Sequence, residues 1–99
     1  MVGFTDIPSQ KLEDLVTFPV LIPVKAVSHK NIAQEVFVQE VLQVTILHVP
    51  EFVEEKIEIR ASSSGNYHAL TLMITFEHVD QVHALDAALR AHPMVRMVL

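Results

Sequence analysis

The chain has no cysteine and no tryptophan, and only two of its 99 residues are glycine. Without cysteine, disulfides, thiolate metal sites and a cysteine nucleophile are excluded. No stretch carries a catalytic, metal-binding or nucleotide-binding motif. A chain of this length forms one domain with a single hydrophobic core and needs no covalent staples.

Long apolar runs are also missing. The longest, Val20 to Val24, contains a proline and is far shorter than the roughly 20 residues that cross a bilayer. The N-terminus has no basic start followed by an apolar run, so no signal peptide is evident. We therefore expect a soluble cytoplasmic protein with no membrane partner.

Positive charge is scarce. Seven Lys and Arg residues stand against twelve Asp and Glu residues, and the formal net charge is −5. Proteins that bind nucleic acid by neutralising phosphates usually have the opposite sign. Stacking of single-stranded RNA also needs aromatic residues among basic ones, and only Tyr67 qualifies. We therefore expect no nucleic-acid partner, while the apolar fraction of 51% hints at an oligomeric surface, such as that of a homodimer.

The rest of the chain is organised around residues 62–76, where a turn leads into the longest alternating segment. Large apolar side chains occupy every second position, which predicts a strand with one face in the core. These positions are Leu70, Leu72, Ile74 and Phe76, and His68 precedes them on the same parity. Gly65 and Asn66 tolerate positive φ, so Ser64 to Tyr67 reads as a hairpin turn. The preceding strand is residues 56–61, and its charged parity is predicted on the sheet face away from the helices: Lys56, Glu58 and Arg60.

Four further elements are predicted from periodicity. Residues 18–27 alternate as a strand that contains Pro19 and Pro23. A helix is expected from His29 to about Leu47, with Ser28 as its N-cap. Its core-facing stripe is predicted to be Ile32, Ala33, Val36, Phe37, Val41 and Val44. A second helix runs from His78 to about His92, and residues 94–99 form a last strand. The stripe of this helix is Val79, Val82, Leu85 and Leu89. Residues 1–16 are expected to form an N-terminal extension, in which a short helix or an irregular terminal segment are alternatives.

The order strand, helix, strand, strand, helix, strand is that of the ferredoxin-like α+β fold. This βαββαβ fold has a four-stranded antiparallel sheet with two helices on one face. We expect residues 17–99 to form this single domain, with the sheet order fourth, first, third, second strand. The strand from Tyr67 to Phe76 is then central.

Three segments resemble a known family. Leu15 to Pro19 (LVTFP), Ser62 to His68 (SSSGNYH) and Val95 to Leu99 (VRMVL) are similar to the YbeD-like family of small bacterial proteins. The resemblance covers residues 12–99. It implies a ferredoxin-like fold similar in shape to ACT domains, which bind small molecules and regulate enzymes. It implies no established activity, although genes of the family often lie beside the octanoyltransferase gene of lipoate synthesis.

Two candidate contact sites follow for a ligand or a partner. The turn of Ser62, Ser63, Ser64, Gly65, Asn66, Tyr67 and His68 could bind an anion through backbone N–H groups, or its serines could serve only the turn. Lys25, Thr71 and Arg96 are predicted beside Tyr67 on the sheet face that the helices leave open. They could hold an anionic small molecule, or this face could be solvated or packed in a dimer.

Metal binding and catalysis find little support. His78 and His83 are five residues apart and fall on different helix faces, although Asp80 and His83 share one. Acylphosphatases, which share the fold, need Gly and Arg after the first strand, where this chain has Val27 to Asn31. We expect no enzyme activity, no catalytic residues, no metal and no cofactor.

The sequence thus favours a regulatory or ligand-sensing module of ACT-like shape with a link to lipoate metabolism. The alternative is a protein–protein adaptor that dimerises through the open sheet face or an edge strand.

Overall fold

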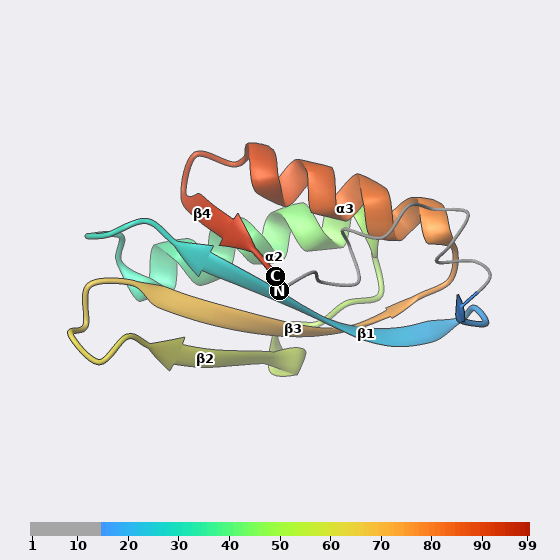
Figure 1. Ribbon diagram of the computed structural model, residues 1–99, viewed down its shortest axis with the longest axis horizontal. Helices are drawn as coiled ribbons and strands as arrows, with labels where there is room; N and C mark the ends of the chain where they lie inside the picture. The colour runs from blue at the N-terminus through green and yellow to red at the C-terminus, as the bar shows by residue number, and fades with distance from the viewer. Residues whose placement is uncertain (1–14) are drawn as a thin grey trace.

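A computed structural model describes residues 15–99, so nearly all of the expected N-terminal extension, residues 1–16, lies outside the described part. The elements follow the predicted order: β1 (Val20–Ser28), α2 (Gln34–His48), a 3₁₀ turn η2 (Glu54–Lys56), β2 (Ile57–Ala61), β3 (His68–Phe76), α3 (Val79–Ala91) and β4 (Val95–Val98). All strand pairs are antiparallel, and both helices lie on one side of the sheet (Figure 1). The ferredoxin-like fold is confirmed.

The sheet has the order β2-β3-β1-β4, as predicted. β1 and β3 pair along eight residues, from Val20 opposite Phe76 to Val27 opposite Ala69. β2 pairs only with the first part of β3, and Ala61 stands opposite His68. The alternation read from residues 68–76 is confirmed, because Leu70, Leu72, Ile74 and Phe76 are fully buried.

Pro23 is accommodated because of where β4 ends. The Lys25 N–H donates to the Leu99 carbonyl at 3.1 Å, so the nitrogen of Lys25 points toward β4. Successive residues of a strand alternate their backbone groups between the two neighbouring strands. The nitrogen of Pro23, two residues earlier, therefore points to the same side but lies beyond the part of β1 that pairs with the β4 segment. No ladder hydrogen bond is lost there.

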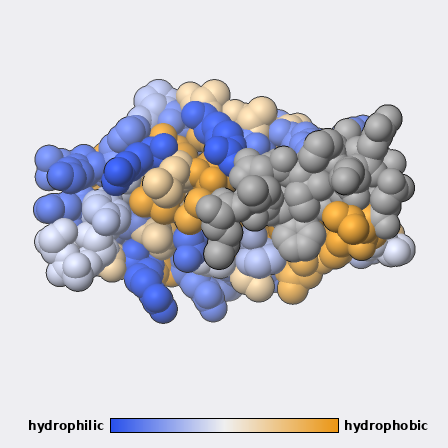
Figure 2. All heavy atoms as spheres, viewed as in Figure 1, coloured by the Kyte–Doolittle hydropathy of each residue, from blue (hydrophilic) through white to orange (hydrophobic). Residues whose placement is uncertain are grey.

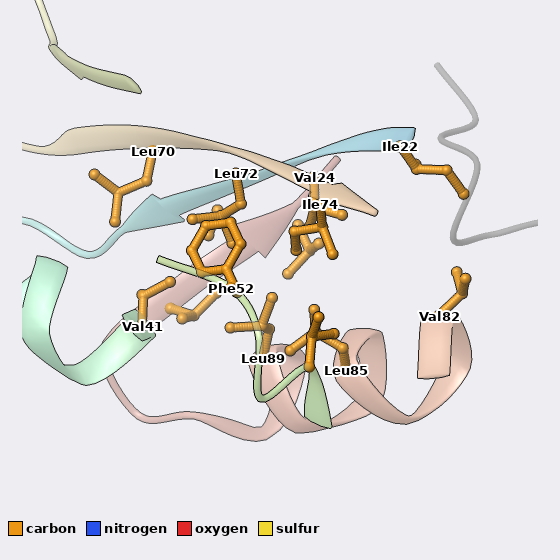
Figure 3. Packing of buried hydrophobic residues seen from close by; sticks show 14 of the residues in the cluster. Ile22, Val24, Val41, Phe52, Leu70, Leu72, Ile74, Val82, Leu85 and Leu89 are labelled. Carbon is orange, nitrogen blue, oxygen red and sulfur yellow. The ribbon is translucent and has the colours of Figure 1, made fainter. Parts of the chain in front are cut away.

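The core lies between the sheet and the two helices. Figure 3 shows side chains of β1 and β3 directed toward those of α2 and α3, with Phe52 among them. From α3, the buried residues are Val79, Val82, Leu85 and Leu89, as its predicted stripe requires. Phe52 comes from the segment between α2 and η2 and is only 5% exposed. Its core role was not predicted, since an isolated aromatic in a connection shows no periodicity.

The predicted start of α2 is wrong. The helix begins at Gln34, and Ser28 is the last residue of β1 rather than an N-cap. The buried Ser28 hydroxyl instead accepts a hydrogen bond from the His68 N–H at 3.0 Å. Asn31 has a φ of 65°, a left-handed conformation that does not belong to a helix. The hydroxyl that resembled a helix cap therefore joins β1 to β3.

The buried face of α2 also differs from the predicted stripe. Phe37 and Val41 are buried as expected, but Val36 is 46% exposed, whereas Thr45 is buried. The Thr45 hydroxyl donates to the Val41 carbonyl at 2.8 Å, which satisfies its polar group inside the core. Apolar residues surround α2 on most sides, so periodicity alone could not select the inner face.

The core predicts a large effect for Leu72→Ala. Leu72 is fully buried in the central strand, and truncation removes apolar contacts and leaves a cavity. We expect the free energy of unfolding to fall by about 3 kcal/mol. Urea denaturation followed by circular dichroism measures it. Leu47→Ala is the matched control, because Leu47 is 79% exposed, and we expect a change below about 0.5 kcal/mol. Equal effects of the two substitutions would contradict the packing described.

Ser28→Ala tests the link between β1 and β3. Removal of the hydroxyl leaves the His68 N–H without its acceptor. The expected loss is about 1–3 kcal/mol of unfolding free energy, measured by the same titration. Ser63→Ala serves as the control, because Ser63 is exposed in the neighbouring turn and should have almost no effect. A neutral Ser28→Ala variant would mean that the buried hydroxyl does not stabilise the fold.

Candidate functional site

The turn between β2 and β3 is longer than predicted. Six residues, 62–67, connect the pair Ala61 and His68, and the expected Ser64–Tyr67 turn lies within them. Gly65 has a φ of 74°, which glycine adopts without strain, while Asn66 does not take the left-handed conformation. The Ser62 hydroxyl accepts hydrogen bonds from the N–H groups of Asn66 and Tyr67 at 3.1 and 3.3 Å. Ser62 therefore organises the turn itself.

The turn also contacts the connection between β1 and α2. The Asn31 N–H donates to the Asn66 carbonyl at 3.0 Å, close to the bond between His68 and Ser28. The His68 Nδ1 atom is buried and has no hydrogen-bond partner in the described part of the chain. These contacts hold two loops together at one end of the sheet and leave Ser63, Ser64 and Gly65 exposed.

Tyr67 and Arg96 lie together, as predicted for the open face. The Arg96 guanidinium carbon is 6.0 Å from the centre of the Tyr67 ring, at the outer limit of a cation–π contact. Arg96 is the extra residue of a bulge in the β1–β4 pairing, since Met97 pairs with Val27 and Val95 with Ser28. Bulges re-aim side chains, and here the result is a contact between β4 and the start of β3.

Lys25 and Thr71 form a second group on the open face. The two residues stand directly opposite one another on β1 and β3, and Glu58 of β2 stands opposite Thr71 on the other side. They border a hollow of about 320 Å³ whose lining residues are Lys25, Glu58, Ile59, Arg60, Ala69 and Thr71. Within the described residues, no ion pair joins the charged groups of this hollow.

A second, more apolar hollow lies beside the first. This hollow, of about 330 Å³, shares Glu58 with the first and is lined by Leu21, Glu55, Lys56, Met73 and Thr75 as well. Leu21 is 54% exposed, and Met97 on β4 is 40% exposed. Figure 2 shows hydrophobic atoms gathered over β4 and along β1, with hydrophilic atoms around them. The open face thus offers charge and exposed apolar surface side by side.

The predicted site residues therefore form two groups. Tyr67 and Arg96 meet near the Ser62–Asn66 turn, whereas Lys25 and Thr71 share the central hollow. Glu58 and Arg60 were predicted on this face but not as contact residues. The alternation of charged and apolar residues in 56–61 was the signal that could have selected them.

The structure gives no support for a metal site in residues 15–99. No group of three His, Asp or Glu side chains there is placed to hold a metal ion. His83 instead has a buried Nε2 atom without a hydrogen-bond partner among the described residues. In the same range, neither helix is long and apolar enough to cross a membrane.

Comparison with known proteins places the chain in a family. The profile described as "Protein of unknown function (DUF493)" matches residues 13–99. A "UPF0250 protein" from Janthinobacterium sp. (strain Marseille) is 39% identical over 88% of this chain and 92% of its own length. Another, "UPF0250 protein YE3006" from Yersinia enterocolitica, is 37% identical over 90% of this chain and 97% of its own.

No solved structure matches the chain. The family profile covers far more than half of the sequence, and the relatives are similar across almost their whole length. The chain therefore belongs to the DUF493 family, in agreement with its resemblance to YbeD-like small bacterial proteins.

Proposed function

We propose that the protein is a non-enzymatic regulatory module that senses a small carboxylate on the open face of its sheet. One observation carries the proposal: the hollow bordered by Lys25, which has no ion-pair partner within residues 15–99, shares Glu58 with a second hollow that Leu21 and Met73 help to line. Such an arrangement suits a molecule with a charged head and a short apolar body.

The head of the ligand would bind at Lys25 and Thr71. The Lys25 ammonium can donate to a carboxylate, and the Thr71 hydroxyl beside it can donate a second hydrogen bond. Both come from neighbouring central strands, so their spacing is fixed by the β1–β3 ladder. Rigid strands position contact residues better than loops do. The charges remain accessible to water, so we expect moderate affinity.

The body of the ligand would lie along Met73 and Leu21. Both side chains belong to the second hollow, which shares Glu58 with the first. Burial of the exposed Leu21 surface would favour binding by the hydrophobic effect. Octanoate and lipoate have this combination of carboxylate and apolar chain, which suits the link to lipoate metabolism implied by the family resemblance.

The turn has a smaller part in this proposal. The Ser62 hydroxyl already accepts two backbone hydrogen bonds, whereas Ser63, Ser64, Gly65 and Asn66 are exposed. Arg96 lies against Tyr67 and could attract an anion to this end of the face. A role of the turn as a ligand contact stays a prediction.

A second candidate function is that of a protein adaptor that uses the open face. The exposed Leu21 and Met97 side chains favour it, because large exposed apolar side chains, methionine among them, are typical of protein contact surfaces. An adaptor of this kind would need no small ligand.

Thermal unfolding of the purified protein with a panel of carboxylates tests the ligand proposal. The panel contains octanoate, lipoate and amino acids. A ligand at ten times its Kd stabilises the folded state by about 1.4 kcal/mol. For a chain of this size we therefore expect the Tm to rise by about 6 °C. In Lys25→Ala we expect this rise to disappear.

Lys30→Ala is the control, because Lys30 is an exposed lysine in the loop after β1, outside both hollows. It should keep the full ligand response. The proposal fails if no compound in the panel raises the Tm, or if Lys25→Ala responds as the unaltered protein does.

A further inference from the structure

The outer edge of β2 is open. Within residues 15–99, β2 pairs with β3 on one side only, and Figure 1 shows no described helix or strand beyond it. Every residue of the strand except Ile57 is exposed. Ile59 is apolar and 45% exposed, which is unusual for an edge strand in water. An open edge of this kind can pair with another chain through its free backbone groups.

We infer that a second copy of this chain pairs with β2, antiparallel and centred on Ile59. A two-fold axis perpendicular to the sheet through this residue would bring Ile59 opposite its counterpart. Glu58 would then stand opposite Arg60 of the other copy, and the reverse pair would form symmetrically. The two four-stranded sheets would join into one continuous sheet, with all four helices on the same side.

The charges select this register. In antiparallel pairing, two residues directly opposite one another point to the same face of the sheet. The open faces of the two copies therefore lie on the same side only when one residue of β2 stands opposite its own counterpart. A centre at Glu58 would set two glutamates opposite each other and Lys56 opposite Arg60. A centre at Arg60 would set two arginines opposite each other. A centre at Ile57 would set Glu58 opposite Lys56, but Lys56 belongs to η2 and not to the strand. Among the residues of β2 itself, only the centre at Ile59 sets opposite charges against each other.

The inner side of the edge also fits a second copy. In the register of β2 and β3, Ile59 stands opposite Leu70, so it lies on the face that the helices cover. Next to Ile59 is a hollow of about 170 Å³ whose other lining residues are Gln34, Glu35, Val38, Gln39 and Glu54. The counterpart Ile59 would approach this hollow and cover exposed apolar surface.

Charged edge residues usually prevent strand pairing. In β2, Glu58 and Arg60 alternate in sign about the apolar Ile59. Within β2, this pattern sets like charges opposite each other when the centre is Glu58 or Arg60, and opposite charges when the centre is Ile59. The pairing does not depend on the proposed ligand, although it would place Arg60, which also borders the central hollow, against Glu58 of the other copy.

Charge reversal on β2 tests the inference by sedimentation equilibrium. We expect the full chain to sediment as a dimer of 11.1 kDa subunits at high micromolar concentration. Glu58→Arg sets like charges opposite each other at both pairs, and so does Arg60→Glu. Each single variant should weaken the dimer about tenfold or more. Circular dichroism confirms that both variants are folded.

Two experiments that restore opposite charges test the Glu58–Arg60 pairs themselves. The double variant Glu58→Arg/Arg60→Glu restores opposite charges and should dimerise again. A mixture of the two single variants should form a heterodimer, because one copy presents two arginines and the other two glutamates. Glu51→Arg, an exposed charge change outside β2, is the control and should leave the dimer unchanged. A monomeric unaltered protein, or a dimer that both single variants leave intact, overturns the inference.

Discussion

The pairing of β1 with β3 is the constraint on which the rest of the structure depends. Eight residue pairs join the two strands. Every second side chain points to the same face, and these side chains form the sheet side of the hydrophobic core. A shift of one residue in this register would turn Leu70, Leu72 and Ile74 to the open face. The two helices cover one face of the sheet because the large apolar side chains of both strands point to that face. The opposite parity then necessarily forms the surface on which Lys25 and Thr71 meet.

Most of the fold could be predicted from the sequence because its strongest signals are periodic. The alternation in residues 68–76 and the helical stripe of Val79, Val82, Leu85 and Leu89 each predict one buried face. The order of elements then restricts the sheet to few topologies. The same parity argument placed Lys25 and Thr71 on one face, and the structure makes them direct neighbours.

Features that depend on contacts between distant residues could not be predicted. Ser28 looked like a helix cap because of its position before an apolar repeat, yet its hydroxyl accepts from His68, forty residues away. Phe52 carried no periodic signal, although it lies in the core. The hollow beside Lys25 also depends on Glu58 and Arg60, which reach it only because β2 pairs with β3. The local sequence pattern does not determine contacts of this kind between distant residues.

The long β1–β3 ladder also has a kinetic consequence. Val20 pairs with Phe76, so the central ladder closes only after the chain between them has been brought together. Closure of so long a segment is entropically costly before native contacts compensate for it. Chains dominated by such distant pairings fold more slowly than helical bundles of similar stability. β1 can therefore complete its longest ladder only after residues 69–76 have become available to pair with it.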